Sequence, residues 1–577
     1  MRPMLSMCAV ESYIRKARGG SIDLRASRGG RDVTWDAISR GWNRRARYRR
    51  LADEALPVSI MALLDEATTA APAAIALHFI EGGREISYAA LRRDVRRLAN
   101  GLRAAGVARG THVGVMLPNL PEMPVTWLAL AAIGAVMVPV NIRYTAHELH
   151  YVLSDSGATH LVVHDERIDL LEAMPAPIPG LVRIVVGTGG DASARGLVWQ
   201  DLVDRASDPF QADPAPGLDD LVNIQYTSGT TGWPKGCLQT QRYWITCAKA
   251  YAFSDGLRYR HILSPNPFFY MTPQWLMLMA FFHRATLHVA PYLSLTRFVE
   301  WLHRHAIDFC WFPTDVVAQT APGPHDRDLA MVRGNLAIHR ADLHAETERR
   351  FGFPARAAFG MTEIGCGLMM PIEAAEMVGS GSCGMAGPFR EARIADPEGR
   401  TLPPGQSGEL LIRGPGIFQG YHRKPEATAA AFHGDWFRTG DLAVQDADGF
   451  FTIQGRIKEM IRRSGENISA TEVEAALLAI PGIVEAAALP VPDALRGEEV
   501  KAYVVLAPGR GPGDVPPEEI VAHCAKRLAA FKVPRLIEYR TAPLPRSTSG
   551  KVRKPDLVAE KPDLRSGSWD RVTGTWL

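Results

Sequence analysis

From about Leu56 the sequence alternates between helical and strand patterns, and this alternation restricts the fold more than any other feature. Ser87 can cap a helix whose apolar side includes Leu91 and Val95, and Val113–Leu117 has the pattern of a short buried strand. Helices that alternate with short apolar strands favour βαβ units, in which helices cover both faces of parallel sheets. The pattern predicts an α/β fold with a large N-terminal domain of βαβ-type sheets.

The periodicity changes in the last third of the chain. After about Gly405, short strands bounded by glycines and charged turns predict a β-rich subdomain. From Glu459 onward the pattern is that of a separate small α+β unit, so Gly455–Glu459 is the candidate hinge. We expect four regions: a basic extension at 1–54, the large domain at 55–457, the small C-terminal domain at 458–556 and a tail at 557–577.

Composition places the chain among ordinary folded proteins, with 46% hydrophobic and 22% charged residues. The net charge is only +3, but residues 1–50 carry 13 Lys and Arg against four acids, which makes that stretch +9. A basic stretch can contact nucleic acid or an anionic membrane. We favour a solvated extension ahead of the first domain and expect no nucleic-acid partner.

Cysteine and histidine usage argues against disulfides and structural metal sites. The seven cysteines are scattered without a C-x-x-C pair, and His303 and His305 share a helical pattern that offers no third ligand. We therefore interpret these two histidines as solvated or core residues. The longest apolar run, Val125–Val140, is shorter than the roughly 20 residues of a membrane helix, and the N-terminus has no apolar signal segment. These features predict a cytoplasmic protein without integral membrane association.

A loop rich in glycine and hydroxyl residues follows the short apolar strand Leu221–Ile224. Its residues are Thr227, Ser228, Gly229, Thr230, Thr231 and Gly232, and Lys235 comes after them. Glycines let successive backbone N–H groups converge on an anion, the hydroxyls add donors, and the lysine adds positive charge. The loop is not a Walker A motif, because Trp233 and Pro234 separate the last glycine from the lysine. The pattern predicts a triphosphate site.

This loop resembles the phosphate loop of the adenylate-forming superfamily, which includes acyl-CoA synthetases, peptide-synthetase adenylation domains and beetle luciferases. Further stretches resemble the later motifs of the family, in the family's order, and the resemblance covers about residues 55–556. They are Ala358–Glu363, Gly408–Gly414, Trp436–Asp441, Gly455–Lys458, Ser464–Ile468 and Pro545–Lys551. The resemblance implies the family's fold, in which the small C-terminal α+β domain is a mobile lid.

The resemblance assigns the nucleotide to these motifs. The second adenylate motif comprises Phe359, Gly360, Met361, Thr362 and Glu363. In the family its threonine contacts the α-phosphate and its glutamate helps to place Mg²⁺. Phe359 stands where the family usually has tyrosine, so stacking on adenine is retained but a hydroxyl is lost. Asp441 is expected to bind both ribose hydroxyls, since a carboxylate can accept two charge-assisted hydrogen bonds, and Arg456 is expected near the ribose.

The C-terminal motifs imply a domain that turns between two half-reactions. Lys458 is expected at the pivot of the hinge, and Lys551 is expected to be the catalytic lysine of adenylate formation. Ser464, Gly465 and Glu466 are expected to form the loop that enters the site for the CoA step. In the family the rotation carries the lysine away and brings this loop in.

The resemblance therefore implies an ATP-dependent acid–CoA ligase. A carboxylate attacks the α-phosphate of ATP, pyrophosphate leaves, and the acyl group of the acyl-adenylate passes to CoA. Mg²⁺, the phosphate loop and Lys551 are expected to position and stabilise the phosphoryl transfer. The expected ligands are thus ATP, Mg²⁺, CoA and a carboxylic acid. An acyl-AMP ligase that loads a carrier protein, a luciferase-like oxygenase and a non-catalytic ATP-binding protein stay open as alternatives, and so does assembly into a homodimer.

By the same resemblance, the acyl pocket is expected to be lined by Phe268, Phe269, Tyr270, Trp275, Thr314 and Arg340. The aromatic residues favour a short or aromatic acid over a long acyl chain. No aspartate lies between Pro265 and Trp275 to bind the amine of an amino acid, so amino acids are disfavoured. Arg340 follows His339 where the family usually has a run of small residues. Either this is a solvated loop, or one of the two side chains contacts a second polar or anionic group of the substrate.

Overall fold

The computed structural model describes residues 44–187, 195–227, 234–337, 341–463, 466–528, 530–547 and 550–577. Contacts divide the chain into two units, Met1–Arg47 and Tyr48–Leu577. Most of the basic extension precedes residue 44 and so lies outside the described residues. Its last part belongs to helix α3 (Arg44–Asp53).

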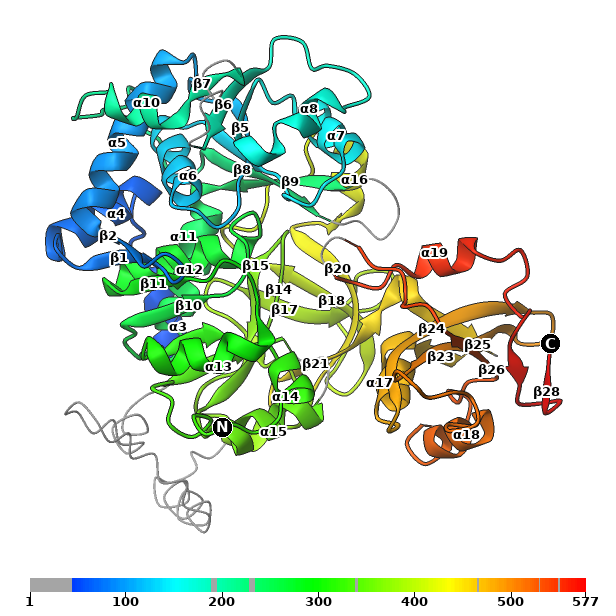
Figure 1. Cartoon of the computed structure of the whole chain (residues 1–577). Helices are drawn as coiled ribbons and strands as arrows, with labels where there is room; N and C mark the ends of the chain where they lie inside the picture. Colours follow the sequence, from blue (N-terminus) through cyan, green and yellow to red (C-terminus); the bar gives the residue numbers. More distant parts are fainter. Residues whose placement is uncertain are drawn as a thin grey trace, which may run out of the picture. The chain divides into compact units, whose positions relative to one another are not determined.

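Seven strands form the first sheet of the large domain, in the order β7-β6-β5-β3-β4-β8-β9 (Figure 1). They are β3 (His112–Met116), β4 (Val136–Pro139), β5 (His160–His164), β6 (Val182–Val186), β7 (Leu197–Val198), β8 (Leu221–Thr227) and β9 (Lys235–Thr240). All pair in parallel except β8 and β9, which are antiparallel. The helices of this part are α5 (Tyr88–Ala104), α6 (Glu122–Ile133), α7 (Ala146–Ser156), α8 (Asp169–Glu172) and α10 (Trp199–Asp204). The predicted cap of α5 is confirmed, because the Ser87 hydroxyl accepts a hydrogen bond from the Ala90 N–H at 3.2 Å.

A second sheet has nine strands in the order β16-β15-β14-β13-β12-β10-β11-β1-β2. They are β1 (Ile75–Phe79), β2 (Arg84–Ser87), β10 (His261–Ser264), β11 (Thr286–Val289), β12 (Phe309–Trp311), β13 (Arg333–Leu336), β14 (Ala355–Met361), β15 (Gly365–Met369) and β16 (Met385–Ala386). The run from β14 to β1 is parallel, and antiparallel strands lie at both ends. Its helices are α4 (Ile60–Ala70), α11 (Gln241–Phe253), α12 (Met271–His283), α13 (Leu295–Arg304), α14 (Asp315–Gln319) and α15 (Ala341–Phe351). The predicted α/β class with βαβ-type sheets is thus confirmed.

The β-rich subdomain and the small domain follow in the order that the sequence predicts. The subdomain is a five-stranded antiparallel sheet of β17 (Glu391–Ala395), β18 (Ser407–Arg413), β19 (Phe432–His433), β20 (Trp436–Gln445) and β21 (Phe451–Arg456), with α16 (Pro425–Ala430). The small domain contains β22 (Met460–Arg463), β23 (Glu466–Ser469), β24 (Ile483–Asp493), β25 (Gly497–Leu506), β26 (Leu536–Arg540), α17 (Ala470–Leu478), α18 (Pro517–Ala525) and α19 (Lys554–Ala559). Its own apolar core lies between the sheet and α17 and α18.

The last residues differ from the tail that we expected at 557–577. They include β27 (Trp569–Asp570) and β28 (Thr575–Trp576), and β27 pairs antiparallel with β26. Trp569 is only 6% exposed and belongs to the core of the small domain. The Asp570 carboxylate lies 3.0 Å from the Arg535 guanidinium. Burial of an indole and this ion pair explain why the segment joins the sheet.

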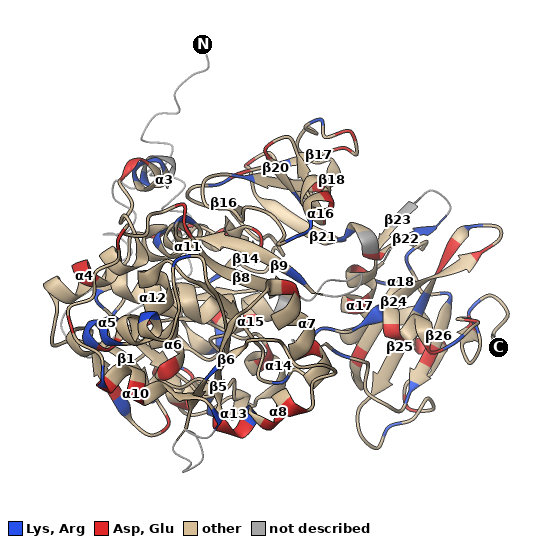
Figure 2. Cartoon of the chain, turned by 90° about the horizontal axis from the view of Figure 1, so that it is seen from above, with Lys and Arg blue, Asp and Glu red and all other residues tan. Residues whose placement is uncertain are grey.

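Charges of both signs are interspersed along the described elements of the protein (Figure 2). Within those elements, none of the helices combines the length and apolar character required to cross a membrane. The six cysteines among the described residues are free and buried.

Candidate active site

The phosphate loop begins and ends at two paired strands. Thr227 ends β8 and is the register partner of Lys235, which begins β9, and the Thr227 hydroxyl donates a hydrogen bond to the Lys235 carbonyl at 3.5 Å. Ser228, Gly229, Thr230, Thr231 and Gly232 lie outside the described residues. The Lys235 ammonium lies 4.8 Å from the centre of the Tyr421 ring, within the range of a cation–π contact. The two ends of the loop are therefore held at one edge of the first sheet, next to an aromatic ring.

The same tyrosine joins this lysine to the predicted magnesium ligand. The Tyr421 hydroxyl donates a hydrogen bond to Glu363 Oε1 at 2.9 Å. Glu363 is only 8% exposed, and its burial raises the pKa of the carboxyl, while the Tyr421 hydrogen bond and the charges of Arg456 and Lys235 oppose that rise. Sequence reasoning missed Tyr421, because it belongs to no motif and meets Glu363 only through the fold.

The turn that carries Thr362 is fixed through its backbone. The Thr362 carbonyl accepts hydrogen bonds from Gln239 Nε2 at 2.8 Å and from the Tyr243 hydroxyl at 3.0 Å. These donors come from β9 and α11, so the turn after β14 is attached to the strand that begins with Lys235. Sequence reasoning missed both donors, because neither belongs to a motif and each meets Thr362 only through the fold.

Phe359, Gly360 and Met361 form the end of β14. Phe359 and Met361 pack against the apolar core around Ile364 and Phe418. A Cβ on Gly360 would collide with the carbonyl oxygen of Gly365 on the partner strand. The hairpin that presents Thr362 and Glu363 therefore needs glycine at this position.

Asp441 and Arg456 are register partners on β20 and β21. The Arg456 Nε lies 3.0 Å from Asp441 Oδ1, and Arg456 Nη1 donates a hydrogen bond to the Thr439 carbonyl at 2.9 Å. Asp441 is 3% exposed, and its Oδ2 is buried without a hydrogen-bond partner among the described residues. Burial raises the pKa of Asp441 to about 6, against the opposing charges of Arg456 and Lys551. An acceptor oxygen that is held in place but unsatisfied is suited to a hydroxyl donor of a ligand.

The C-terminal motif brings a lysine to the same carboxylate. Lys551 is exposed, and it lies in a short hairpin in which its carbonyl accepts a hydrogen bond from the Ser547 N–H at 2.8 Å. Its charge acts on the pKa of Asp441, although 110 residues separate them in the sequence. Lys458 lies in the 3₁₀ turn Ile457–Glu459 between β21 and β22, and its side chain is outside the described part of the chain. Ser464 and Gly465 are also outside it, while the backbone of Glu466 begins β23.

The predicted acyl segment runs from β10 into α12 and is held by side-chain amides. Gln274 Nε2 donates to the Phe268 carbonyl at 3.0 Å, and Gln225 Nε2 donates to the Phe269 carbonyl at 2.8 Å. Asn223 Nδ2 donates to Gln274 Oε1 at 2.9 Å and so links α12 to β8. Sequence reasoning missed these three amides, although a polar residue between apolar neighbours is a signal that could have found them.

The aromatic residues of this region pack on one another. The Trp275 ring stacks on Tyr251 with centres 4.1 Å apart, and its edge meets Trp311 at 6.1 Å. Phe268 and Phe269 are 1% and 4% exposed, Tyr270 is half-buried, and Thr314 is the N-cap of α14. Arg340 lies outside the described residues. Three of the residues predicted to line the acyl pocket, Phe268, Phe269 and Trp275, are therefore buried, and Trp275 lies in a cluster of packed aromatic rings.

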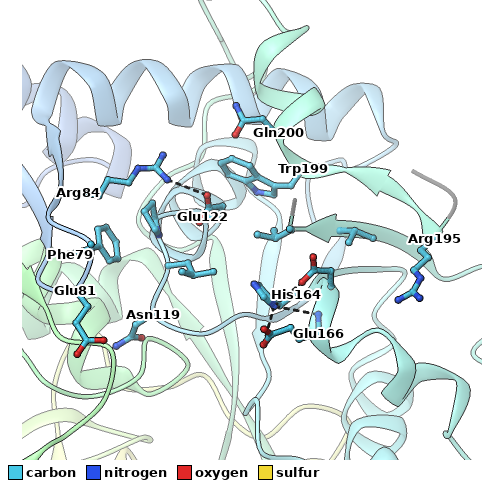
Figure 3. Close-up of a pocket in the computed structure, with 17 residues that line it drawn as sticks. Phe79, Glu81, Arg84, Asn119, Glu122, His164, Glu166, Arg195, Trp199 and Gln200 are labelled. Carbon is cyan, nitrogen blue, oxygen red and sulfur yellow. Dashed lines mark hydrogen bonds and ion pairs between the residues drawn. The ribbon is translucent and has the colours of Figure 1, made fainter. Parts of the chain in front are cut away.

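A separate cavity of about 1180 Å³ lies at the carboxyl ends of β1, β5 and β6 (Figure 3). The side chains of Arg84 and Glu122, which both line the cavity, point toward each other, and Arg84 Nη1 lies 3.6 Å from Glu122 Oε1. None of the described residues that line it belongs to the motifs above. Asn119, on its wall, accepts a hydrogen bond from the Phe268 N–H at 2.8 Å and so connects this region to the acyl segment.

Comparisons with known proteins identify the family of the chain. The AMP-binding enzyme family matches residues 64–422, and the AMP-binding enzyme C-terminal domain matches residues 472–551. A feruloyl-CoA synthase from Amycolatopsis sp is 34% identical over 484 residues, which is 82% of this chain and 94% of that protein. A sulfoacetate–CoA ligase from Cupriavidus necator is 32% identical over 493 residues, which is 83% of this chain and 93% of that protein.

Solved structures of o-succinylbenzoate CoA synthetase from Bacillus subtilis have a similar fold. The complex with its acyl-adenylate intermediate has a TM-score of 0.75 at 25% identity and covers 88% of this chain and 98% of the other. The complex with ATP and a magnesium ion has a TM-score of 0.74 at 26% identity and covers 86% and 99%. Because the family match spans most of the chain and the relatives align over nearly their whole length, this protein belongs to the family of AMP-binding enzymes.

Proposed function

We propose that this protein is an acid–CoA ligase whose acid is short or aromatic, and that the residues around Asp441, Glu363 and Lys235 hold the nucleotide. The reaction class is that of an AMP-forming acyl-CoA synthetase. The enzyme activates a carboxylic acid as an acyl-adenylate, releases pyrophosphate and transfers the acyl group to CoA. The carrier-protein ligase and the luciferase-like oxygenase are not favoured, since the relatives that align with the chain are CoA ligases.

The unsatisfied Oδ2 of Asp441 is the observation that carries the nucleotide assignment. A buried carboxylate oxygen without a donor is costly unless a ligand completes it. The ribose of ATP offers two adjacent hydroxyls, and Arg456 already holds the other carboxylate oxygen in place. This supports Asp441 as the ribose ligand.

Glu363 has the features that a nucleotide-bound magnesium ion requires. Such an ion takes one or two protein carboxylates and completes its shell with phosphates and water. Glu363 is buried, is oriented by the Tyr421 hydroxyl and lies close enough to Lys235 for that charge to act on its pKa. When bound, the ion neutralises phosphate charge; Lys235 and Lys551 add fixed positive charge, and the Thr362 turn positions the α-phosphate.

For the acid itself, the aromatic wall supports a planar or short substrate. The stacked rings of Trp275 and Tyr251 and the edge of Trp311 form a rigid apolar surface. The relatives include one enzyme named for an aromatic acid and one named for a sulfonated acid. We propose an aromatic acid first, with Arg340 or His339 in contact with any second anionic group.

Pyrophosphate release across a panel of carboxylic acids, with and without CoA, tests the proposal when product masses are recorded. We expect turnover that requires CoA and yields an acyl-CoA, with the highest kcat/KM for an aromatic acid. Turnover that ignores CoA would overturn the ligase assignment, and preference for a long acyl chain would overturn the substrate class. Within the panel, Arg340→Ala should lower kcat/KM for dicarboxylic acids relative to monocarboxylic ones.

Size-exclusion chromatography with light scattering tests the proposed homodimer, and cell fractionation tests the proposed cytoplasmic location.

A further inference from the structure

Four histidines that belong to none of the nucleotide or acyl motifs meet on one face of the second sheet. His78 lies on β1, His261 on β10 and His288 on β11, and His305 is the C-cap residue of α13. His78 and His288 are register partners on adjacent parallel strands. Leu263 is the partner of His288 on the other side, so His261 lies two residues earlier on the same face. The chain brings these rings together from segments up to 227 residues apart in the sequence.

The ring nitrogens of three of these histidines lie close enough together for one metal ion to reach them all. One nitrogen from each of His78, His288 and His305 lies within 4.8 Å of the other two. The Nδ1 atoms of His78 and His288 are 2.9 Å apart, and the His305 ring centre lies 5.1 Å from that of His78 and 5.3 Å from that of His288. A tetrahedral ion with bonds of about 2.0–2.1 Å holds two ligand nitrogens about 3.3 Å apart. To bind the ion, the His78 and His288 nitrogens would move apart by a few tenths of an ångström, and the His305 nitrogen, which lies within 4.8 Å of them, would move closer.

Two further observations point to a ligand at this place. The Nε2 atom of His305 is buried and has no hydrogen-bond partner among the described residues, although the ring lies against the cluster. The other side of the His288 ring is occupied, because its Nε2 lies 3.1 Å from His261 Nδ1. A histidine that binds metal through one nitrogen usually has its other nitrogen held by a neighbour in this way.

The donor set selects the class of ion. Three imidazoles without a carboxylate or thiolate suit zinc and other late first-row divalent ions, whereas magnesium and calcium require oxygen ligands. His288 is only 5% exposed, so the central ring of the cluster lies inside the protein and not on its surface.

We propose that His78, His288 and His305 bind one divalent transition-metal ion of the zinc class, and that His261 orients His288. The ion would tie the C-terminal end of α13 to strands β1 and β11. It is separate from the magnesium of the reaction, and its role is to stabilise the second sheet. The sequence predicted no third ligand for the pair His303 and His305; the fold supplies ligands to His305 from two distant strands.

A second histidine group nearby provides the necessary control. His303, two residues earlier on α13, stacks on His325 at 4.1 Å and lies 3.1 Å from the Asp328 carboxylate, which is 81% exposed. An exposed group of this kind can bind zinc weakly without being a built site. The double variant His303→Ala/His325→Ala removes it and leaves the proposed ligands intact.

The test uses the full chain without a histidine tag. After chelation and dialysis, the protein is equilibrated with Zn²⁺ in excess Mg²⁺, passed through gel filtration and analysed for bound metal. We expect about one retained zinc in the wild type and in His303→Ala/His325→Ala, and its loss in His305→Ala. A wild type without retained zinc would overturn the proposal, and so would retention by His305→Ala together with loss in the double variant.

A spectroscopic measurement covers the case in which His305→Ala does not fold. Co²⁺ added to the His303→Ala/His325→Ala protein should give the visible bands of a tetrahedral site with nitrogen ligands, and Zn²⁺ should abolish them. The spectrum of octahedral aqueous Co²⁺ alone would refute the site. Circular dichroism and CoA-dependent turnover establish that each variant is folded, and the thermal midpoint of the wild type should rise with Zn²⁺ but not with further Mg²⁺.

Discussion

At the scale of single residues, Asp441 is the proposed ligand of the ATP ribose. Its carboxylate is buried, one oxygen is held by Arg456, and the other has no donor among the described residues. Hydrogen bonds to a charged group contribute about 1.5–3 kcal/mol, which corresponds to about 10–100-fold in affinity. Asp441→Asn keeps the shape but removes the charge, so we expect KM for ATP to rise about 10–100-fold. Pyrophosphate release against ATP concentration measures it, and an unchanged KM would contradict the assignment.

We expect the same carboxylate to make the use of ATP sensitive to acid. Burial raises the pKa of Asp441 to about 6, above its usual value of 3.8. The carboxylate is therefore charged above that pH and becomes protonated as the pH falls through about 6. Once protonated, it can no longer accept charge-assisted hydrogen bonds from the ribose hydroxyls. We expect KM for ATP to rise on acidification through this window. In Asp441→Asn, KM should be high throughout and should not change in the same window; a parallel rise there would assign the effect to another group.

Tyr421 is the residue that links the phosphate-loop lysine to the magnesium ligand. Tyr421→Phe retains the ring under Lys235 but leaves Glu363 Oε1 without its donor, so the pKa of Glu363 rises further and the carboxylate becomes a poorer ligand. We expect the apparent KM for Mg²⁺ to rise about tenfold. The matched control is Tyr539→Phe, whose hydroxyl donates to the Val515 carbonyl in the small domain. Equal effects of the two variants would exclude the proposed link.

At the scale of elements, the C-terminal hairpin completes the small domain. Trp569 on β27 is 6% exposed and packs in the core, whereas Trp576 on β28 is 54% exposed. Removal of a buried aromatic side chain costs about 3–5 kcal/mol. Trp569→Ala should therefore lower the free energy of unfolding of the small domain by about this amount, while Trp576→Ala should change it by about 0.5 kcal/mol or less. Chemical denaturation monitored by tryptophan fluorescence compares the two variants. If Trp569→Ala lowered the free energy of unfolding as little as Trp576→Ala does, the hairpin would not be part of the core of the small domain.

At the scale of the whole molecule, we expect the two half-reactions to depend on Lys551 in different ways. Lys551 belongs to the small domain, and its charge reaches Asp441 of the large domain. Loss of one preorganised charge typically costs about 10²–10³ in rate. Lys551→Ala should therefore slow adenylate formation by about this factor and leave thioester formation from a preformed adenylate nearly intact. Rapid-quench assays of each half-reaction measure this, with Lys532→Ala, a surface ion-pair residue, as control. Equal loss of both would contradict a rotation that carries the lysine away.

The distribution of charge over the molecule bears on how ATP is bound. Charges are interspersed over the described elements (Figure 2), and the groups proposed to bind ATP are a few side chains, buried or partly buried apart from the exposed Lys551. Binding is thus attributed to local groups and not to a global field. Of the +9 carried by residues 1–50, five positive charges lie in helix α3, and the remaining +4 lies outside the described residues.

The sequence by itself determined what depends on local pattern. The alternation after Leu56 specified parallel sheets, and the order of the motifs identified the family, because periodicity, caps and glycine-rich turns are written in neighbouring residues. The roles of the individual site residues stay predictions that the experiments above address, and the boundaries of the domains stay predictions as well.

Only the tertiary structure decided which distant residues touch. Tyr421 reaches Glu363 across 58 residues, and His78 reaches His288 across 210. Strand order and register set these contacts, and neither is encoded in a local period, so a tyrosine outside every motif and a histidine on an apolar strand carried no signal of their partners. The expected tail at 557–577 differs for the same reason, since the sheet edge that takes up Trp569 is formed by residues 536–540. The sequence thus specified the chemistry that the chain can perform, and the fold selected the side chains that are brought together to perform it.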